Sequence, residues 1–239
     1  MGVFRPKARP RCGVWHVSDP CRDCGDQLAF IYGNSLKIIA LLLAGGASSR
    51  MGSRDKLLED VDGAPLLRQR AQACLKSGVT GVRVVLPPNR PERIGALDGL
   101  DVEIIFNDGS DLGMSHSLQR GVENIDADAL LIVLADLPDL TAEHMQQVVN
   151  AAKAHPDATI FRGASTDGKA GHPVLLRKDL FSQLNTLTGD IGAQPLLQRH
   201  KLDTVLVPIG ASVVRDLDTP EDWAAWRAEQ SKDPNSSAQ

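Results

Sequence analysis

Short apolar runs alternate with longer stretches of helical periodicity along most of the chain. The runs favour buried strands, and they lie at residues 38–43, 82–86, 102–106, 130–135, 159–161, 173–176 and 204–208. Between them, residues 65–76 and 114–125 place apolar side chains on one helical face, and Thr141 is a suitable cap for a further helix. This alternation predicts an α/β fold, a three-layer sandwich with a mostly parallel central sheet.

The expected sheet also indicates where chemistry should lie. In open α/β sheets, ligands bind outside the carboxyl ends of the strands. The loops after Leu43, Phe106 and Ala135 are therefore the candidate site.

The periodic pattern begins near Ser35 and fades near Gln230. Residues 1–35 hold Pro, Arg, Cys and Gly in no periodic order, and we interpret them as a poorly ordered leader. Residues 36–230 are expected to form a single domain. Residues 231–239 are polar and are expected to be a flexible tail.

Composition excludes several classes of function. The 239 residues carry a net charge of −4, with 4% aromatic residues and no stripe of Lys and Arg, which argues against a nucleic-acid binder. No apolar run approaches the roughly 18 residues of a membrane span. No targeting segment is recognised, so we expect a cytoplasmic protein without a membrane partner.

The four cysteines do not form a disulfide framework. Cys74 lies on an apolar helical face and is expected to be a small core residue. Cys21 and Cys24 form one CxxC pair, with Cys12 and His16 upstream, which together offer four zinc donors. Because the upstream pair is only loosely like a metal knuckle and no second CxxC exists, an incidental leader is favoured over a zinc or redox site.

The loop after the first predicted strand is the most informative segment. Residues 43–58 read Leu-Ala-Gly-Gly-Ala-Ser-Ser-Arg-Met-Gly-Ser-Arg-Asp-Lys-Leu-Leu. Small residues let backbone N–H groups approach an anion closely, and Arg50 and Lys56 add positive charge. The loop has neither the Walker spacing nor GxGxxG. It is therefore predicted to bind polyphosphate in a different way.

The same string, Leu-Ala-Gly-Gly-x-Ser-x-Arg-Met-Gly followed by Lys56, resembles the nucleotidyltransferases of the molybdenum-cofactor family, within the wider sugar-nucleotide pyrophosphorylase-like enzymes. The resemblance extends over residues 36–226. Residues 135–138 are similar to the family's metal-binding strand end, residues 171–174 to its substrate-side turn, and residues 216–222 to its closing motif. It implies a Rossmann-like fold of the nucleotide-diphospho-sugar transferase type.

Two sister activities of that family join either GMP or CMP to molybdopterin. Residues 113–118 and 189–193, with Asp216 and Asp218, resemble the cytidylyltransferase branch. The Leu-Ala-Gly-Gly that ends at Gly46 instead matches the guanylyltransferase branch, because the cytidylyltransferase branch usually has Leu-Ala-Ala-Gly in that loop. The resemblance implies transfer of CMP from CTP to the phosphate of molybdopterin, with release of pyrophosphate. A GTP-using enzyme, a sugar-phosphate nucleotidyltransferase and a non-catalytic cofactor carrier stay open as alternatives.

Nucleotidyl transfer requires a positioned α-phosphorus, neutralised charge and a bridging metal. We assign catalysis to Arg50, Lys56 and Asp136. Mg²⁺ is the expected cofactor, and Asp136 is its expected ligand. The alternative role for Asp136 is to cap a turn before Pro138. Asp218 is either a second metal ligand, a substrate-side group or a helix cap beside Thr219. Nucleotide binding is assigned to Leu43, Ala44, Gly45, Gly46, Ser48, Ser49, Arg50, Met51, Gly52 and Lys56.

Five residues are assigned to the pterin side of the site, namely Ser115, Ser117, Pro138, Gly171 and His172. The two serines lie near a predicted helix start, where free N–H groups favour anions, so they either contact a phosphate or cap the helix. His172 either contacts the pterin or is a surface turn residue. A recipient molybdoenzyme or its chaperone is the expected protein partner.

Overall fold

The computed structural model describes residues 36–210, 215 and 217–231. The predictions for the leader with its cysteines, for Asp216 and for the tail beyond Ser231 lie outside these residues. Within them, none of the helices combines the length and apolar character needed to span a membrane.

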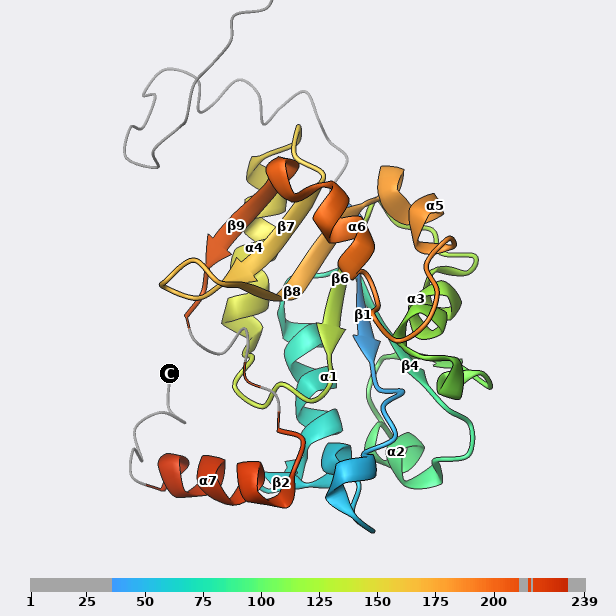
Figure 1. Cartoon of the computed structure of the whole chain (residues 1–239), viewed down its shortest axis with the longest axis vertical. Coiled ribbons are helices and arrows are strands. Elements are labelled where there is room, and N and C mark those ends of the chain that lie inside the picture. Colours follow the sequence, from blue (N-terminus) through green and yellow to red (C-terminus); the bar gives the residue numbers. More distant parts are fainter. Residues whose placement is uncertain (1–35, 211–214, 216, 232–239) are drawn as a thin grey trace, which may run out of the picture. The chain divides into compact units, whose positions relative to one another are not determined.

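Seven strands form one sheet in the order β5-β4-β1-β6-β8-β7-β9 (Figure 1). Strand β8 is antiparallel to both of its neighbours, and every other pairing is parallel, which confirms the mostly parallel sheet. The strands are β1 (Ile38–Leu43), β4 (Gly81–Leu86), β5 (Glu103–Phe106), β6 (Ala129–Leu134), β7 (Ile160–Ala164), β8 (Ala170–Arg177) and β9 (Thr204–Pro208). A small hairpin of β2 (Asp60–Val61) and β3 (Ala64–Pro65) was not expected from the sequence.

Helices cover both faces of the sheet, so the three-layer arrangement is confirmed. Helices α1 (Leu66–Lys76) and α4 (Ala142–Ala154) belong to the larger core cluster, and α3 (Met114–Val122), α5 (Phe181–Leu184) and α6 (Gln194–Arg199) contribute to the other. The alternation of a strand explains the division. Leu42 of β1 is in the first cluster, whereas Leu41 and Leu43 are in the second. Helix α2 (Pro91–Ala96) lies beside the β1 loop, and α7 (Pro220–Gln230) is the last helix of the described residues (Figure 1).

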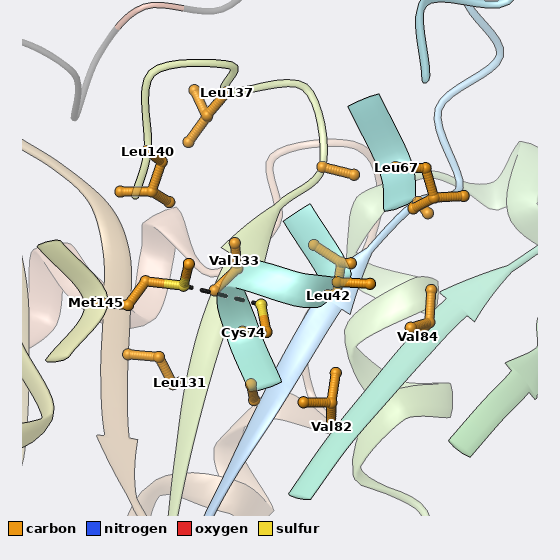
Figure 2. Packing of buried hydrophobic residues seen from close by; sticks show 14 of the residues in the cluster. Leu42, Leu67, Cys74, Val82, Val84, Leu131, Val133, Leu137, Leu140 and Met145 are labelled. Carbon is orange, nitrogen blue, oxygen red and sulfur yellow. Dashed lines mark hydrogen bonds between the residues drawn. The ribbon is translucent and has the colours of Figure 1, made fainter. Parts of the chain in front are cut away.

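The larger cluster explains Cys74. Its side chain is buried on α1, with Sγ 3.8 Å from Sδ of Met145 on α4 (Figure 2). Burial raises the pKa of the Cys74 thiol to about 12, so the thiol stays protonated and unreactive. The predicted role as a core residue is confirmed.

Two threonines cap the helices that follow them. Thr141 Oγ1 accepts a hydrogen bond from His144 N, as its position predicted. Thr219 Oγ1 accepts one from Asp222 N, and Asp222 accepts in return from Thr219 N at 2.9 Å. Thr219 and not Asp218 therefore caps α7, which leaves the carboxylate of Asp218 available for other contacts.

One local prediction was wrong. Residues 171–174 were expected to form a substrate-side turn, but they lie inside β8. His172 and Val174 therefore project from a central strand of the sheet instead of from a surface turn.

Candidate active site

The loops after β1, β5 and β6 meet at one cavity of about 610 Å³. This first cavity is at the carboxyl ends of the parallel strands, where the sequence predicted the chemistry. Its lining includes Gly45, Gly46, Ala47 and Ser49 from the β1 loop, Ser110–Met114 and Ser117 from the segment after β5, Asp136 after β6, and Gly189 and Asp190.

Two predicted cations and two predicted carboxylates meet beside this cavity. Lys56 Nζ lies 2.7 Å from Asp136 Oδ2 and 2.6 Å from Asp218 Oδ1. Arg50 Nη1 lies 2.7 Å from Asp218 Oδ2. Burial alone would lower the pKa of Lys56, but attraction by Asp136 and Asp218 outweighs it and raises that pKa. The lysine is therefore a fixed positive charge at neutral pH.

Asp136 and Asp218 differ in how many of their carboxylate oxygens have a hydrogen-bond partner. Asp136 Oδ1 is buried and has no hydrogen-bond partner among the described residues, whereas both oxygens of Asp218 are held by cations. Within the described ranges, no group of three or more His, Cys, Asp and Glu side chains is arranged to bind a metal. A hard cation here would draw one or two carboxylates from the protein, beginning with Asp136 Oδ1.

Arg93 of α2, which sequence reasoning missed, holds the β1 loop in place. Its side chain is fully buried. It donates to Ala44 O at 2.5 Å, to Gly46 O at 2.7 Å and to both oxygens of Asp55 at 2.7 and 2.9 Å. Burial would raise the pKa of Asp55, but Arg93 and the other donors lower it. A polar residue in a six-residue helix carries no periodic signal that could have found it.

The β1 loop bends sharply around Arg50. Ser48 has φ 55° and Gly52 has φ 66°, a backbone region in which glycine is the least strained residue. Ser48 Oγ donates to Asp55 Oδ1 and accepts from Lys56 N. Ala44 and Met51 are buried in the core and line neither cavity, and the backbone of Ala44 is engaged by Val85 O and by Arg93.

The prediction of free donors at the start of α3 was wrong. Met114 N donates to Asp190 Oδ1 and Ser115 N donates to Gly189 O, each at 3.1 Å. The segment of Gly189 and Asp190 comes from far along the chain, and it occupies the donors that were expected to bind an anion. A Cβ at Gly113 would lie 2.7 Å from the Gly189 backbone, so only glycine permits this contact.

The two predicted serines have different environments. Ser117 lines the first cavity, and its Oγ accepts a 3.0 Å hydrogen bond from Asn107, a buried residue that the sequence did not single out. Ser115 is buried, lines neither cavity, and its Oγ has no partner in the described structure.

A second cavity of about 680 Å³ adjoins the first and shares Leu43, Met114, Leu134 and Asp190 with it. His172 lines this second cavity together with Arg162 of β7. Burial, and then the charge of Arg162, lower the pKa of His172 to about 4. Pro138 and Gly171 are buried and line neither cavity.

Comparison with known proteins identifies the family. Residues 40–205 match the MobA-like NTP transferase domain. The chain belongs to the MobA-like NTP transferase family. It is a nucleotidyltransferase, and the family resemblance that the sequence of the β1 loop indicated is confirmed.

Two relatives of this MobA-like chain match different shares of its length. The purine catabolism protein PucB of Bacillus subtilis is 29% identical over 198 residues, covering 78% of this chain and 94% of PucB. A probable molybdenum cofactor guanylyltransferase of Natronomonas pharaonis is 32% identical, covering 51% of this chain and 60% of that protein.

Solved structures confirm the fold. Rv0371c of Mycobacterium tuberculosis superposes with a TM-score of 0.71 at 20% identity, covering 81% of this chain and 98% of Rv0371c. The same protein has been solved in complex with manganese, with a TM-score of 0.67 at 19% identity, covering 79% of this chain and 97% of that one.

Proposed function

We propose that this nucleotidyltransferase transfers CMP from CTP to the phosphate of molybdopterin and releases pyrophosphate. The observation that carries the proposal is the cluster of Arg50, Lys56, Asp136 and Asp218 beside the first cavity. It supplies cations for a triphosphate and a carboxylate oxygen for a metal at the carboxyl ends of the strands, as nucleotidyl transfer requires.

Each part of the site has its own proposed role in nucleotide binding or in the transfer step. Gly45 and Gly46, which line the first cavity, are assigned to the base and ribose, and Arg93 anchors this loop through Ala44 O and Gly46 O. Arg50 and Lys56 bind the β- and γ-phosphates. An oxygen of the acceptor's phosphate attacks the α-phosphorus, the bond to the β-phosphate oxygen breaks, and the cations stabilise the pyrophosphate that leaves. No protein nucleophile is needed.

Mg²⁺ is the cofactor that we propose, and the residues present fit it. Asp136 Oδ1 is buried without a hydrogen-bond partner in the described structure, and Asp218 is close enough to share Lys56 with Asp136. Mg²⁺ commonly takes one or two carboxylates together with phosphate oxygens, and when bound it neutralises phosphate charge. The manganese complex of the structurally similar Rv0371c supports a divalent metal at this fold.

The preference for CTP rests on one wall of the first cavity. Residues 113–118 and 189–193, which resemble the cytidylyltransferase branch, touch through Met114 N and Asp190 and through Ser115 N and Gly189. Against this, the third residue of Leu-Ala-Gly-Gly is Gly45, as in the guanylyltransferase branch. A Cβ at Gly45 would lie 3.1 Å from Ser117 Oγ, so packing against that wall is a second reason for this glycine.

GTP is the second candidate nucleotide, and the molybdenum cofactor guanylyltransferase among the relatives favours it. A non-catalytic carrier is disfavoured because a carrier has no use for Lys56 shared between two carboxylates at a triphosphate site. Delivery of the product to a recipient molybdoenzyme or its chaperone remains part of the proposal.

The test is pyrophosphate release from the full chain with Mg²⁺ and molybdopterin, with CTP, GTP, ATP and UTP compared in parallel. We expect CTP-selective release. Selective release with GTP would instead make the protein a guanylyltransferase. Release with none of the four nucleotides would contradict the proposed acceptor, and binding of nucleotide without release would support a carrier.

A further inference from the structure

A charged side chain lies on the core-facing side of α1. Arg70 belongs to the buried stripe of this helix, three residues after Leu67 and four before Cys74. Those two side chains are part of the larger core cluster, which also contains Leu137 and Leu140 (Figure 2). Arg70 is only 6% exposed, and its guanidinium contacts backbone carbonyls and no carboxylate of the described residues. Because burying a charge lowers the free energy of unfolding, this arginine needs an explanation.

The guanidinium of Arg70 holds the turn that follows β6. Its Nη1 donates to Leu137 O at 3.2 Å and also to Leu140 O. Leu137 O accepts a further hydrogen bond from Leu140 N at 3.3 Å, so the two leucines close the turn. The donor comes from a helix 67 and 70 residues away in the sequence. Arg70 therefore anchors this turn to α1.

The anchored turn carries Asp136. The residue before it, Ala135, donates its N–H to Leu43 O of β1 at 3.1 Å. The residue after it, Leu137, is the one that Arg70 holds. Asp136 is thus fixed through the backbone on both sides, while its Oδ1 is buried without a hydrogen-bond partner in the described structure. Because an unpartnered buried oxygen is unfavourable, a mobile turn would let it move toward a donor, and a rigid turn prevents this.

From this geometry we propose that Arg70 is a positioning residue, which holds the turn after β6 so that Asp136 Oδ1 stays free for the metal. The inference rests on the proposed function, because it takes Asp136 as a metal ligand. Arg70 lines neither cavity, so it acts through Asp136 and not on the nucleotide. Removal of a group that supports a metal ligand commonly weakens metal binding about 10- to 100-fold.

Arg177 is a matched control at the other end of α4. Like Arg70, it donates to backbone carbonyls, Ala152 O at 2.7 Å and Ala158 O at 2.9 Å, and it lines neither cavity. These carbonyls lie in the last turns of α4 and just after it, whereas Leu140 lies just before the cap of the same helix. Loss of either arginine should destabilise the fold, but only loss of Arg70 should affect metal binding.

The first experiment measures Mn²⁺ binding to the full chain in the presence of CTP. Electron paramagnetic resonance follows the free ion, with CTP alone as the blank, and Mn²⁺ is the probe because it takes the same oxygen ligands as Mg²⁺. We expect Arg70→Met to raise the Mn²⁺ dissociation constant about tenfold and Arg177→Met to leave it unchanged. Arg70→Lys keeps a donor on α1, so its dissociation constant should lie between those of Arg70→Met and the wild type.

Two further measurements separate positioning from stability. Both Met variants should lower the midpoint of thermal unfolding by several degrees, because each leaves carbonyls without their donor. CTP binding in EDTA, measured by calorimetry, should be the same in every variant, because the nucleotide loop is not altered. If Arg70→Met does not fold, Arg70→Lys decides the question by the same comparison and should still bind Mn²⁺ several-fold more weakly than the wild type.

Mn²⁺ affinity that is equal in the Arg70 variants and the wild type would overturn the inference. An equal loss in Arg177→Met would also overturn it, since a general loss of stability would then explain the effect. Absence of Mn²⁺ binding by the wild type would overturn the proposed metal and the inference together. If the wild type binds Mn²⁺ but releases no pyrophosphate with molybdopterin, the proposed acceptor fails, and the comparison of Arg70→Met with Arg177→Met still decides the inference.

A double variant tests whether Arg70 acts through Asp136. Arg70→Met should lower kcat for pyrophosphate release about tenfold in the wild-type background. In the Asp136→Asn background it should lower kcat no further, because the carboxylate that Arg70 positions is already absent. The same loss in both backgrounds would show that Arg70 acts on another part of the site, which contradicts the inference.

Discussion

At the scale of single residues, Lys56 connects two carboxylates that are far apart in the sequence, one from the middle of the domain and one from near its C-terminal end. Asp136 ends the turn after β6, and Asp218 precedes α7, yet both bind the same ammonium. The carboxylate with the unpartnered oxygen, Asp136, is therefore the residue whose charge the proposed chemistry requires most.

Asp136→Asn should abolish most turnover while nucleotide binding survives. The amide keeps the shape but loses the negative charge that a metal and Lys56 need, so we expect kcat to fall by a factor of ~10² or more, with the dissociation constant of CTP changing by only a few-fold. Asp139→Asn is the control, because Asp139 accepts a hydrogen bond from Trp226 and lines neither cavity. Pyrophosphate release at the wild-type rate from Asp136→Asn would contradict the assignment.

His172 should make stability depend on pH below neutrality. Its pKa is about 4 in the fold against 6.5 for an ordinary histidine, so the unfolded chain binds a proton first as the pH falls. The contribution is complete above about pH 6.5 and is lost progressively toward about pH 4, to a total of about 3 kcal/mol. Urea unfolding between these limits measures it. His172→Gln should flatten this part of the curve, and an unchanged slope in that variant would refute the buried neutral imidazole.

At the scale of elements, α2 matters to the site although it contributes nothing to the cavity wall. Its Arg93 reaches the β1 loop and donates to the carbonyls of Ala44 and Gly46. The short helix is therefore a support for the loop.

Arg93→Met should raise the KM for CTP and destabilise the fold. The variant removes the donors to Ala44 and Gly46 and leaves the carboxylate of Asp55 without its main partner. We expect a KM increase of about tenfold or more and a loss of about 3 kcal/mol in unfolding free energy, as for a broken buried ion pair. Arg93→Met/Asp55→Leu removes both charges, so it should recover stability without recovering KM. Recovery of both, or a KM that never changes, would show that the loop does not need this support.

The caps of α4 and α7 offer a matched pair of helix variants. Each cap is a Thr in a capping box, but only the helix capped by Thr219 is preceded by Asp218. Thr219→Ala and Thr141→Ala should each cost about 1 kcal/mol of stability. Only Thr219→Ala should also lower kcat, because it loosens the segment that positions Asp218 against Lys56 and Arg50. Equal kcat in the two variants would disprove that coupling.

Local patterns account for most elements and for the loops of the site. Strand β1 matches its apolar run at both ends, and Thr141 was identifiable as a cap from sequence alone. Helices α2 and α6 escaped prediction because each has only six residues and no apolar period. Local sequence could not predict the antiparallel direction of β8 or the contact of Arg93 with Ala44, because both depend on residues far apart in the chain. The occupied donors of α3 were missed for the same reason, since Asp190 approaches from 76 residues away.

At the scale of the whole molecule, nucleotide and metal should stabilise the fold together. A ligand at about one hundred times its dissociation constant adds about 2.7 kcal/mol to the free energy of unfolding. CTP with Mg²⁺ should therefore raise the unfolding midpoint more than CTP with EDTA, and EDTA should abolish pyrophosphate release, with Mg²⁺ or Mn²⁺ restoring it. Full activity in EDTA would exclude a metal requirement for the reaction. Removal of the metal alone should not unfold the chain.

The ion cluster beside the first cavity has a consequence for how ligands arrive. Arg50 and Lys56 carry two positive charges, Asp136 and Asp218 two negative ones, and the four cancel. A neutral group of charges exerts little attraction beyond a Debye length, so it cannot steer a distant triphosphate by its own field. Phosphate oxygens instead replace Asp218 on the cations at contact. Nucleotide association should accordingly depend weakly on ionic strength, and capture will be selective for anions that fit the loop after they have arrived.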